Sequence, residues 1–154
     1  MADLASRTLV LQALKDSRIA SLATVSSDGV PHAATVVFAV DDDFNIYFVT
    51  RENTTKVKNI AANPIVSLSM GAKPPVYVQM RGRAERIDGD VALREKMLSE
   101  VARAGAGIED IWPPIMHIGN SDYILFRVVP EFIRGLDLRD QHIAADEPPF
   151  IQIM

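Results

Sequence analysis

The chain has 154 residues, of which 48% are hydrophobic and 23% charged, and these values are typical of one globular domain with its own core. The absence of cysteine excludes disulfides, a thiol nucleophile and cysteine-ligated metals, and it fits a reducing, cytoplasmic compartment. A net charge of −4 argues against nonspecific binding of nucleic acid, and no apolar run approaches the roughly 20 residues that a membrane-spanning helix needs.

The first third of the chain predicts one helix and three short strands. Apolar residues recur at helical spacing over residues 4–16, which indicates an amphipathic helix. The period then changes, and runs rich in small and β-branched residues alternate with turns that contain aspartate or glycine. The predicted strands are Ile19–Val25, Val30–Val40 and Ile46–Thr50. Because their connections are short, we expect an antiparallel meander.

The rest of the chain adds two helices and four strands. An apolar stripe at helical spacing predicts a helix over residues 53–62, which ends at Asn63-Pro64. A third helix is predicted over residues 90–104. Residues 105–119 are expected to be irregular, because Pro113-Pro114 excludes the interior of a helix. The predicted strands of this part are Ile65–Met70, Val76–Ile87, Ser121–Pro130 and, as a seventh, Phe132–Leu138.

The spacing of the strands predicts a mainly β fold, an antiparallel barrel of six or seven strands with peripheral helices. A parallel arrangement would need a helix between most strands, and the pattern lacks these helices. Residues 1–138 are expected to form the domain and residues 139–154 a C-terminal arm or tail. Val30–Val40 and Val76–Val78 carry more apolar residues than the interior of one small barrel is expected to hold, which favours a homodimer.

The segment that carries chemistry is the polar turn and helix start within residues 49–63. Thr54-Thr55-Lys56 brings together two hydroxyls, free N–H groups of a first helical turn and an ammonium group. This set of donors suits a terminal phosphate, to which Arg51 or Lys58 would add a further positive charge. The alternative is an ordinary capped helix with solvated lysines.

The order of these elements resembles the FMN-binding split-barrel family related to pyridoxamine 5'-phosphate oxidase. The matching features are the strand Ile19–Thr24, the turn Asp28-Gly29, the proline-led strand Pro31–Phe38, the strand Ile46–Thr50, Thr54-Thr55-Lys56, Asn63-Pro64 and the strand Tyr77–Ile87. The resemblance covers roughly residues 8 to 130. It rests on the ordered set, because each motif alone is common.

The resemblance implies a split barrel that holds FMN at the interface of a homodimer. It places the FMN phosphate on Thr55 and Lys56. The ring and ribityl contacts fall on the main chain or side chains of Thr35, Val36, Val37, Val49 and Thr50. Since side chains of a strand alternate, Val36 and Phe38 face one side and Thr35 and Val37 the other, and the alternative for these four residues is ordinary barrel core. An apolar slot with a few polar anchors suits a flavin.

Two departures separate this chain from a true pyridoxamine 5'-phosphate oxidase. Ala34 stands where the oxidase has an arginine for the phosphate. The C-terminal Arg-Leu-x-Asp-Arg motif of the oxidase, which holds pyridoxal phosphate, is replaced by the unrelated sequence Gly135–Arg139. Oxidation of pyridoxamine 5'-phosphate is therefore not expected.

The implied function is that of an FMN-dependent oxidoreductase, which passes hydride or electrons between flavin and a small-molecule redox substrate. The sequence identifies no catalytic acid or base, and no histidine lies at a metal-ligand spacing. Two alternatives stay open. One is a reductase that uses the deazaflavin F420, whose longer acidic tail would need more cations than Arg51, Lys56 and Lys58. The other is a non-catalytic sensor or storage module for flavin or haem.

Three further features allow two interpretations each. His32 lies on the strand expected near the flavin, and it is either a ligand contact or a half-buried strand residue. Trp112 is either a wall of the site or a packing residue. Arg81 and Arg83 share a strand face with Glu85, which predicts a charge-balanced outer surface and not a nucleic-acid site.

Overall fold

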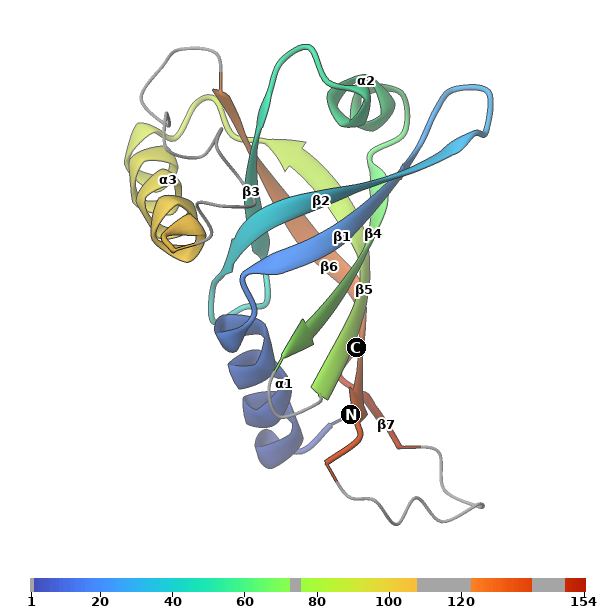
Figure 1. Ribbon diagram of the computed structural model, residues 1–154, viewed down its shortest axis with the longest axis vertical. Helices are drawn as coiled ribbons and strands as arrows, with labels where there is room; N and C mark the ends of the chain where they lie inside the picture. The colour runs from blue at the N-terminus through green and yellow to red at the C-terminus, as the bar shows by residue number, and fades with distance from the viewer. Residues whose placement is uncertain (1, 73–75, 108–122, 140–148) are drawn as a thin grey trace.

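The computed structural model describes residues 2–72, 76–107, 123–139 and 149–154 (Figure 1). Within these residues the helices are α1 (Leu4–Asp16), α2 (Thr55–Ala62) and α3 (Val91–Gly105). The strands are β1 (Ile19–Val25), β2 (Pro31–Val40), β3 (Ile46–Arg51), β4 (Ile65–Ala72), β5 (Val76–Arg86), β6 (Tyr123–Asp137) and β7 (Phe150–Gln152). All three predicted helices and the first five predicted strands are present, with bounds close to those expected.

One antiparallel sheet closes on itself. Its strands follow the order β3-β2-β1-β4-β5-β6-β7, and β3 also pairs with β6. This pairing joins the two sides of the sheet into a barrel of six strands, and β7 adds to the free edge of β6 (Figure 1). Closure leaves six of the strands with a neighbour on both sides, which removes most of the exposed edges of the sheet. The predicted fold class is confirmed.

The last two strands of the sheet differ from the prediction. The two strands expected over residues 121–130 and 132–138 are one continuous strand, β6. Pro130 does not interrupt it, because the register with β5 shifts between Arg81 and Gly82 and Glu131 becomes an extra, unpaired residue. A bulge of this kind accommodates a residue that has no N–H group. The seventh strand is instead β7, which lies within the segment expected as an arm or tail.

The barrel interior contains the larger of two apolar clusters. Its fully buried large side chains include Leu22, Phe38, Phe48, Met80 and Ile133. The rings of Phe48 and Phe126 stack with their centroids 5.3 Å apart, which links β3 to β6 across the closing pair of strands.

A second cluster lies between α3 and the outer face of β2, β3 and β6 (Figure 1). It joins Met97 and Val101 of the helix to Val37, Tyr47 and Leu125 of the strands. The large apolar residues of β2 are therefore divided between the barrel interior and the α3 side, and Val76 and Val78 of β5 are inside the barrel. Val30 and Tyr77 stay exposed, with 57% and 45% of their surface accessible, so one chain buries part of the apolar residues of the two segments and leaves others on its surface.

Helix α2 covers one end of the barrel, at the opposite end from α1 (Figure 1). Ile60 enters the barrel core, and the side-chain amide of Asn59 donates a hydrogen bond to the hydroxyl of Thr24 on β1 at 3.0 Å. Both polar groups are buried, with 5% and 1% of their surface exposed. Since a buried polar group that loses its partner is costly, this pair fixes the position of the helix on the barrel.

Gly82 is expected to be intolerant of a side chain, because a Cβ atom there would lie 2.3 Å from the main-chain oxygen of Val129. Gly82→Ala should lower the free energy of unfolding by about 1–3 kcal/mol, the usual cost of overpacking a strand interior. Urea unfolding followed by circular dichroism measures the change. Gly89→Ala is the matched control, since a Cβ atom at that position has no heavy atom within 4 Å. Equal stability of the two variants would contradict the close approach of β5 and β6.

Candidate functional site

The barrel opens where β2 and β3 separate. Their ladder ends at Phe38 and Phe48, although β2 begins at Pro31 and β3 continues to Arg51. Before Phe38, β2 pairs only with β1, and beyond Phe48, β3 pairs only with β6. The residues that the resemblance assigns to the ring and ribityl chain lie on the two sides of this split, and they are Thr35, Val36 and Val37 on β2 and Val49 and Thr50 on β3.

The side chains at the split alternate as the sequence predicts. Val36 is part of the barrel interior, whereas Val37 and Val49 pack in the cluster under α3. Thr35 is exposed. The N–H group of Phe38 donates to the carbonyl of Arg18 on the β1 side at 3.1 Å, so strand alternation turns the main-chain groups of Val37 and Thr35 toward the β3 side. A ligand in the split would meet the Thr35 side chain and main-chain groups, and not the buried valine side chains.

The N-terminus of α2 lies at the end of the split, directly after β3. Its N-cap residue Thr54 has extended backbone angles but makes no side-chain hydrogen bond to the first turn. The caps of α1 and α3 are different, because Asp3 accepts from the Ser6 N–H group at 2.7 Å and Asp90 accepts from the Leu93 N–H group at 3.0 Å. The hydroxyl of Thr54 instead donates to the carbonyl of Arg51 at 3.2 Å. The first turn of α2 therefore keeps donors that no side chain of the cap satisfies.

Lys56 places a half-buried ammonium group at this first turn. Its Nζ atom donates to the hydroxyl of Thr50 at 3.3 Å. Among the described residues it forms no ion pair with a carboxylate, and burial lowers its pKa from the ordinary value of 10.5. A cation that has lost part of its hydration without gaining a counter-ion is stabilised when an anion binds beside it. Thr55, the other residue assigned to the phosphate, is exposed on the same turn.

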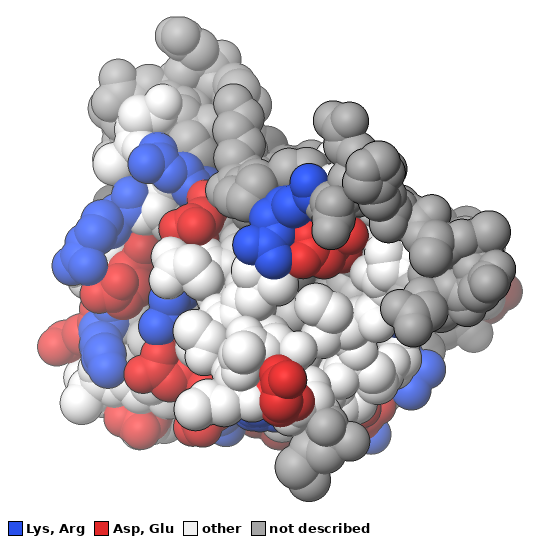
Figure 2. All heavy atoms as spheres, turned by 90° about the horizontal axis from the view of Figure 1, so that it is seen from below, with Lys and Arg blue, Asp and Glu red and all other residues white. Residues whose placement is uncertain are grey.

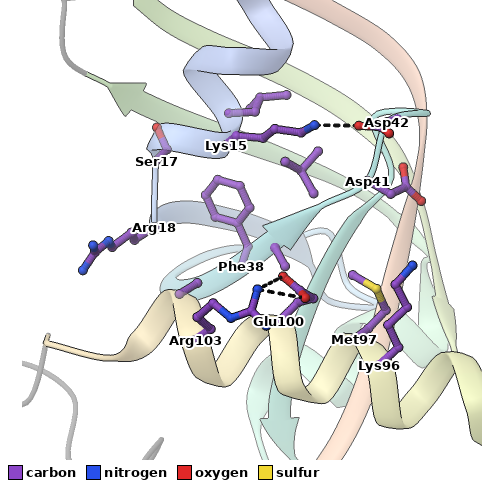
Figure 3. A pocket seen from close by; sticks show the side chains of 14 residues that line it. Lys15, Ser17, Arg18, Phe38, Asp41, Asp42, Lys96, Met97, Glu100 and Arg103 are labelled. Atoms are coloured by element: carbon purple, nitrogen blue, oxygen red, sulfur yellow. Dashed lines mark hydrogen bonds and ion pairs between the residues drawn. The ribbon is translucent and has the colours of Figure 1, made fainter.

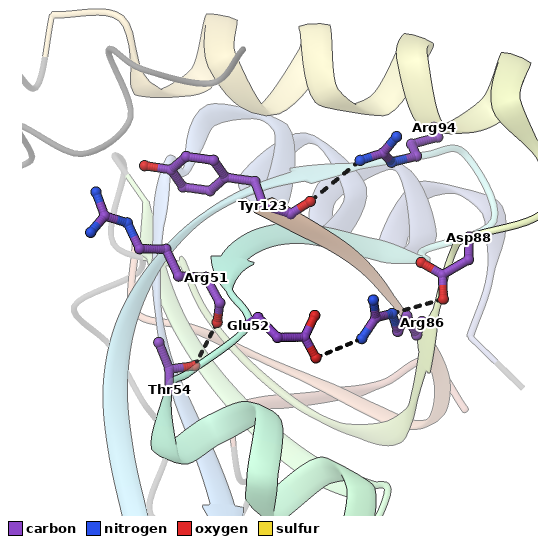
Figure 4. A network of polar contacts seen from close by, with 7 residues as sticks. All are labelled: Arg51, Glu52, Thr54, Arg86, Asp88, Arg94 and Tyr123. Atoms are coloured by element: carbon purple, nitrogen blue, oxygen red, sulfur yellow. Dashed lines mark hydrogen bonds and ion pairs between the residues drawn. The ribbon is translucent and has the colours of Figure 1, made fainter. Parts of the chain in front are cut away.

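The neighbouring charges are already engaged in other contacts (Figure 4). Glu52, the nearest acid in sequence to Lys56, pairs with Arg86 at 2.9 Å, and Arg86 also pairs with Asp88 at 2.7 Å. Hydrogen bonds to Asp88 and Glu52 raise the pKa of Arg86. The guanidinium of Arg51 lies 5.7 Å from the centroid of the Tyr123 ring. Arg86 thus pairs with the one carboxylate of the turn between β3 and α2.

Some of the contacts that shape the site are absent from the sequence prediction. In the interpretation as an ordinary capped helix, Asn53 was the expected cap, whereas the N-cap residue is Thr54, whose hydroxyl lies within hydrogen-bond distance of the Thr50 hydroxyl. The buried pair formed by Asn59 and Thr24 was also missed. A polar residue on the apolar stripe of a short helix was the available signal for Asn59, since such a residue needs a buried partner.

The weaker candidates have mixed outcomes. His32 is half-buried on β2, opposite Thr24, and its buried Nδ1 atom has no hydrogen-bond partner among the residues that the structure describes. Arg81 and Arg83 are on the exposed face of β5, as predicted, and Glu85 on that face pairs with an arginine of β6 at 2.9 Å. Trp112 lies outside the described residues.

A separate pocket of about 530 Å³ lies between α1, the second half of β2 and α3 (Figure 3). Its floor is apolar, with Phe38 and Met97 among the lining residues. Most of the charges at its rim are paired, since Lys15 contacts Asp42 at 2.6 Å and an arginine of α3 contacts a glutamate of the same helix. The pocket borders the segment of β2 that is still paired with β3, and it is therefore distinct from the split.

The charged surface is mixed. Figure 2 shows acidic and basic side chains interspersed over the face seen from below, and among the described residues neither sign forms a continuous patch there. None of the described helices has both the length and the apolar composition that crossing a bilayer requires.

Comparison with known proteins gives one family and a set of similar folds. The family model described as pyridoxamine 5'-phosphate oxidase matches residues 8–134. No curated protein sequence matches the chain. General Stress Protein 26 from Bacillus anthracis has a similar structure, with a TM-score of 0.67 and 22% identity over 96% of this chain and 98% of that one.

Two other solved structures carry names that mention a ligand. A FAD-binding protein from Mesorhizobium loti has a TM-score of 0.65 and 22% identity, over 83% of this chain and 91% of that one. HutZ, described as the heme storage protein of Vibrio cholerae, has a TM-score of 0.62 and 19% identity, over 80% of this chain and 89% of that one. At these identities the likeness concerns the fold. Because the family model spans most of the chain, from α1 to the end of the barrel, this protein belongs to the pyridoxamine 5'-phosphate oxidase family.

Proposed function

We propose that the protein is an FMN-binding flavoprotein that passes hydride or electrons between flavin and a small-molecule redox substrate, with the flavin at a homodimer interface. The observation that carries the proposal is the half-buried ammonium of Lys56, which has no carboxylate partner among the described residues and lies at the uncapped first turn of α2. A phosphate dianion would accept hydrogen bonds from both. The family match and the FAD-binding relative of similar fold support a flavin.

Different residues would bind the phosphate and the ring of the flavin, at the two ends of the split. Lys56, Thr55 and the N–H groups of the first turn would hold the phosphate, because they form the only described part of the split that combines directed donors with a positive charge. Thr35 and the main-chain groups of β2 that point toward β3 would orient the ring by hydrogen bonds to its polar edge. Bound flavin would supply the redox chemistry, and the protein would supply binding, orientation and exclusion of water.

FMN fits this donor set better than F420. The longer acidic tail of F420 would require further free cations along the groove. Arg51 contacts the Tyr123 ring, Arg86 is neutralised by two carboxylates, and Lys58 is exposed on the helix. One well-placed ammonium group and one helix N-terminus match a single terminal phosphate.

Haem storage or sensing is the second candidate function. It is supported by the similar fold of the heme storage protein from Vibrio cholerae and by His32, whose buried Nδ1 atom has no hydrogen-bond partner in the described part of the chain. An imidazole nitrogen without a partner is able to ligate iron. The visible spectrum of freshly purified protein separates the candidates, since flavin bands support the first and a Soret band that is lost in His32→Ala supports the second.

The homodimer is supported by the family and by the outer face of β1, β2 and β4. This face carries exposed small side chains, among them Ser21, Ala23, Ala33, Ser67 and Ser69, around a hollow of about 410 Å³. Small side chains on a sheet allow a second sheet or chain to approach closely. The proposal is that a second copy covers this face and completes the flavin site.

The role of Lys56 is tested by three single variants. Lys56→Ala should weaken FMN binding by about 1.5–3 kcal/mol, the value of a charge-assisted hydrogen bond, which is about a ten- to hundredfold change in dissociation constant. Thr55→Val should cost less, about 1 kcal/mol, because it removes a neutral donor. Lys58→Ala is the matched control, since Lys58 is exposed and points away from Lys56 on the helix. Titration of apo protein followed by flavin fluorescence ranks the variants, and a silent Lys56→Ala would refute the placement of the phosphate.

The cost of burying Lys56 gives a second, ligand-free test. Lys56→Met should unfold at the same or a higher urea concentration than the wild type at about pH 7, because the variant removes a buried charge. The folded pKa of Lys56 lies below the unfolded value of 10.5, so between these values the unfolded chain binds the extra proton and wild-type stability rises with pH. The advantage of the variant should therefore shrink from about pH 7 to about pH 10. A strongly destabilised variant would show that Lys56 serves the fold and not a ligand.

The dimer is tested by a charge on the proposed interface. Ala23→Arg should convert the protein to a monomer and abolish FMN binding, because the exposed methyl group would be replaced by a long cation at the centre of the covered face. Sedimentation velocity at micromolar concentration measures the state. Val91→Arg, at the exposed start of α3, carries the same charge change and should stay dimeric. A wild type that sediments as a monomer and still binds FMN would overturn the interface site.

A further inference from the structure

Thr50 occupies the centre of a short chain of polar groups beside the split. Its hydroxyl lies 3.3 Å from the Nζ atom of Lys56 and 3.2 Å from the hydroxyl of Thr54. The Thr54 hydroxyl in turn lies 3.2 Å from the carbonyl oxygen of Arg51. Thr50 is almost fully buried, with 6% of the surface of the residue exposed. These contacts join the end of β3 to the first turn of α2.

The direction of the hydrogen bonds follows from the number of protons. A hydroxyl group carries one proton, and Thr54 uses its proton on the carbonyl of Arg51, which can only accept. In the contact between the two hydroxyls, Thr50 must therefore donate and Thr54 accept. The oxygen of Thr50 is then left to accept from Lys56, whose ammonium has no acceptor role. The chain has a single order, from Lys56 through Thr50 and Thr54 to Arg51.

This order changes the role of Thr50. The only proton of its hydroxyl is engaged and its side chain is buried, so it offers no donor to an anion in the split. To bind a phosphate group directly, the Thr50 hydroxyl would have to donate a hydrogen bond. What it provides is an acceptor that holds the Lys56 ammonium at the start of α2. A free lysine side chain loses rotamer freedom when it binds a ligand, and a lysine that is held in place beforehand loses less.

We infer that Thr50 is a positioning residue of the phosphate site, whose hydroxyl acts through Lys56 and not by donating a hydrogen bond to the ligand. The inference rests on the proposed function, because it deepens the account of the same site. Thr50 engages one of the three ammonium protons of Lys56, and within the described part of the chain no acceptor engages the other two, which would serve the anion.

The test is a double-mutant cycle with FMN as the probe. Thr50→Val, which preserves the shape of the side chain and removes the hydroxyl, should weaken FMN binding about three- to tenfold, the effect of one hydrogen bond. Thr50→Ser keeps the hydroxyl and should restore binding to within about twofold. In the Lys56→Ala background, Thr50→Val should have no further effect, because the group through which Thr50 acts is absent.

A second measurement needs no ligand. The Lys56 pKa, followed by NMR of the side chain, should decrease further in Thr50→Val, because the variant removes a hydrogen bond that favours the charged form. It should return to the wild-type value in Thr50→Ser. A purely structural role of Thr50 would not produce this pattern in two variants of equal stability.

The outcomes are distinguishable from failure of the proposed function. If the wild type binds no FMN, the phosphate site and this inference fail together. If the wild type binds FMN and Lys56→Ala weakens binding, but Thr50→Val is silent, only the inference fails. If Thr50→Val weakens binding equally with and without Lys56, Thr50 contacts the ligand directly and the positioning role is wrong.

Discussion

The pairing of β3 with β6 is the interaction on which the rest of the molecule depends. A strand has two edges, and β3 uses one for β2 only as far as Phe48 and the other for β6 along its whole length. The barrel can close only if β3 turns toward β6, and the same turn opens the gap between β3 and β2. The stacked rings of Phe48 and Phe126 hold the closing pair from inside. The closure of the barrel and the split between β2 and β3 therefore both follow from the pairing of β3 with β6.

The position of α2 follows from this geometry. The chain leaves β3 at the edge of the split, and α2 begins after a turn of three residues. The first helical turn must therefore lie beside the gap, whatever its sequence. The sequence decides what is presented there, namely an uncapped helix start and an ammonium group that burial makes costly. A general feature of the topology places the site, and a few local residues determine its chemistry.

The sequence predicted the elements well because their signals are local. The stripe of apolar residues in α1 and the alternation in β1 and β5 do not depend on distant contacts. Pro130 misled the division of β6, since the bulge that accommodates a proline depends on the partner strand and not on the residue. The assignment of Lys56 rested on the family order and a helix start. The hydroxyl chain through Thr50 and the pair formed by Asn59 and Thr24 join residues whose relative position only the closed barrel defines.

The hydrogen bond between Asn59 and Thr24 has a consequence for affinity. A helix of two turns is not stable by itself in water, so α2 persists only while it stays docked on the barrel. Its detachment would be a local opening that leaves the sheet intact, with a free energy below that of global unfolding. Only the docked fraction presents the amides and the ammonium group together, and the apparent dissociation constant of any anion is the intrinsic constant divided by that fraction. Amide exchange in α2 would therefore measure the free energy of this local opening, and from it the docked fraction. Mutations at Asn59 or Thr24 that lower this fraction would raise the apparent dissociation constant without changing the groups that bind the anion.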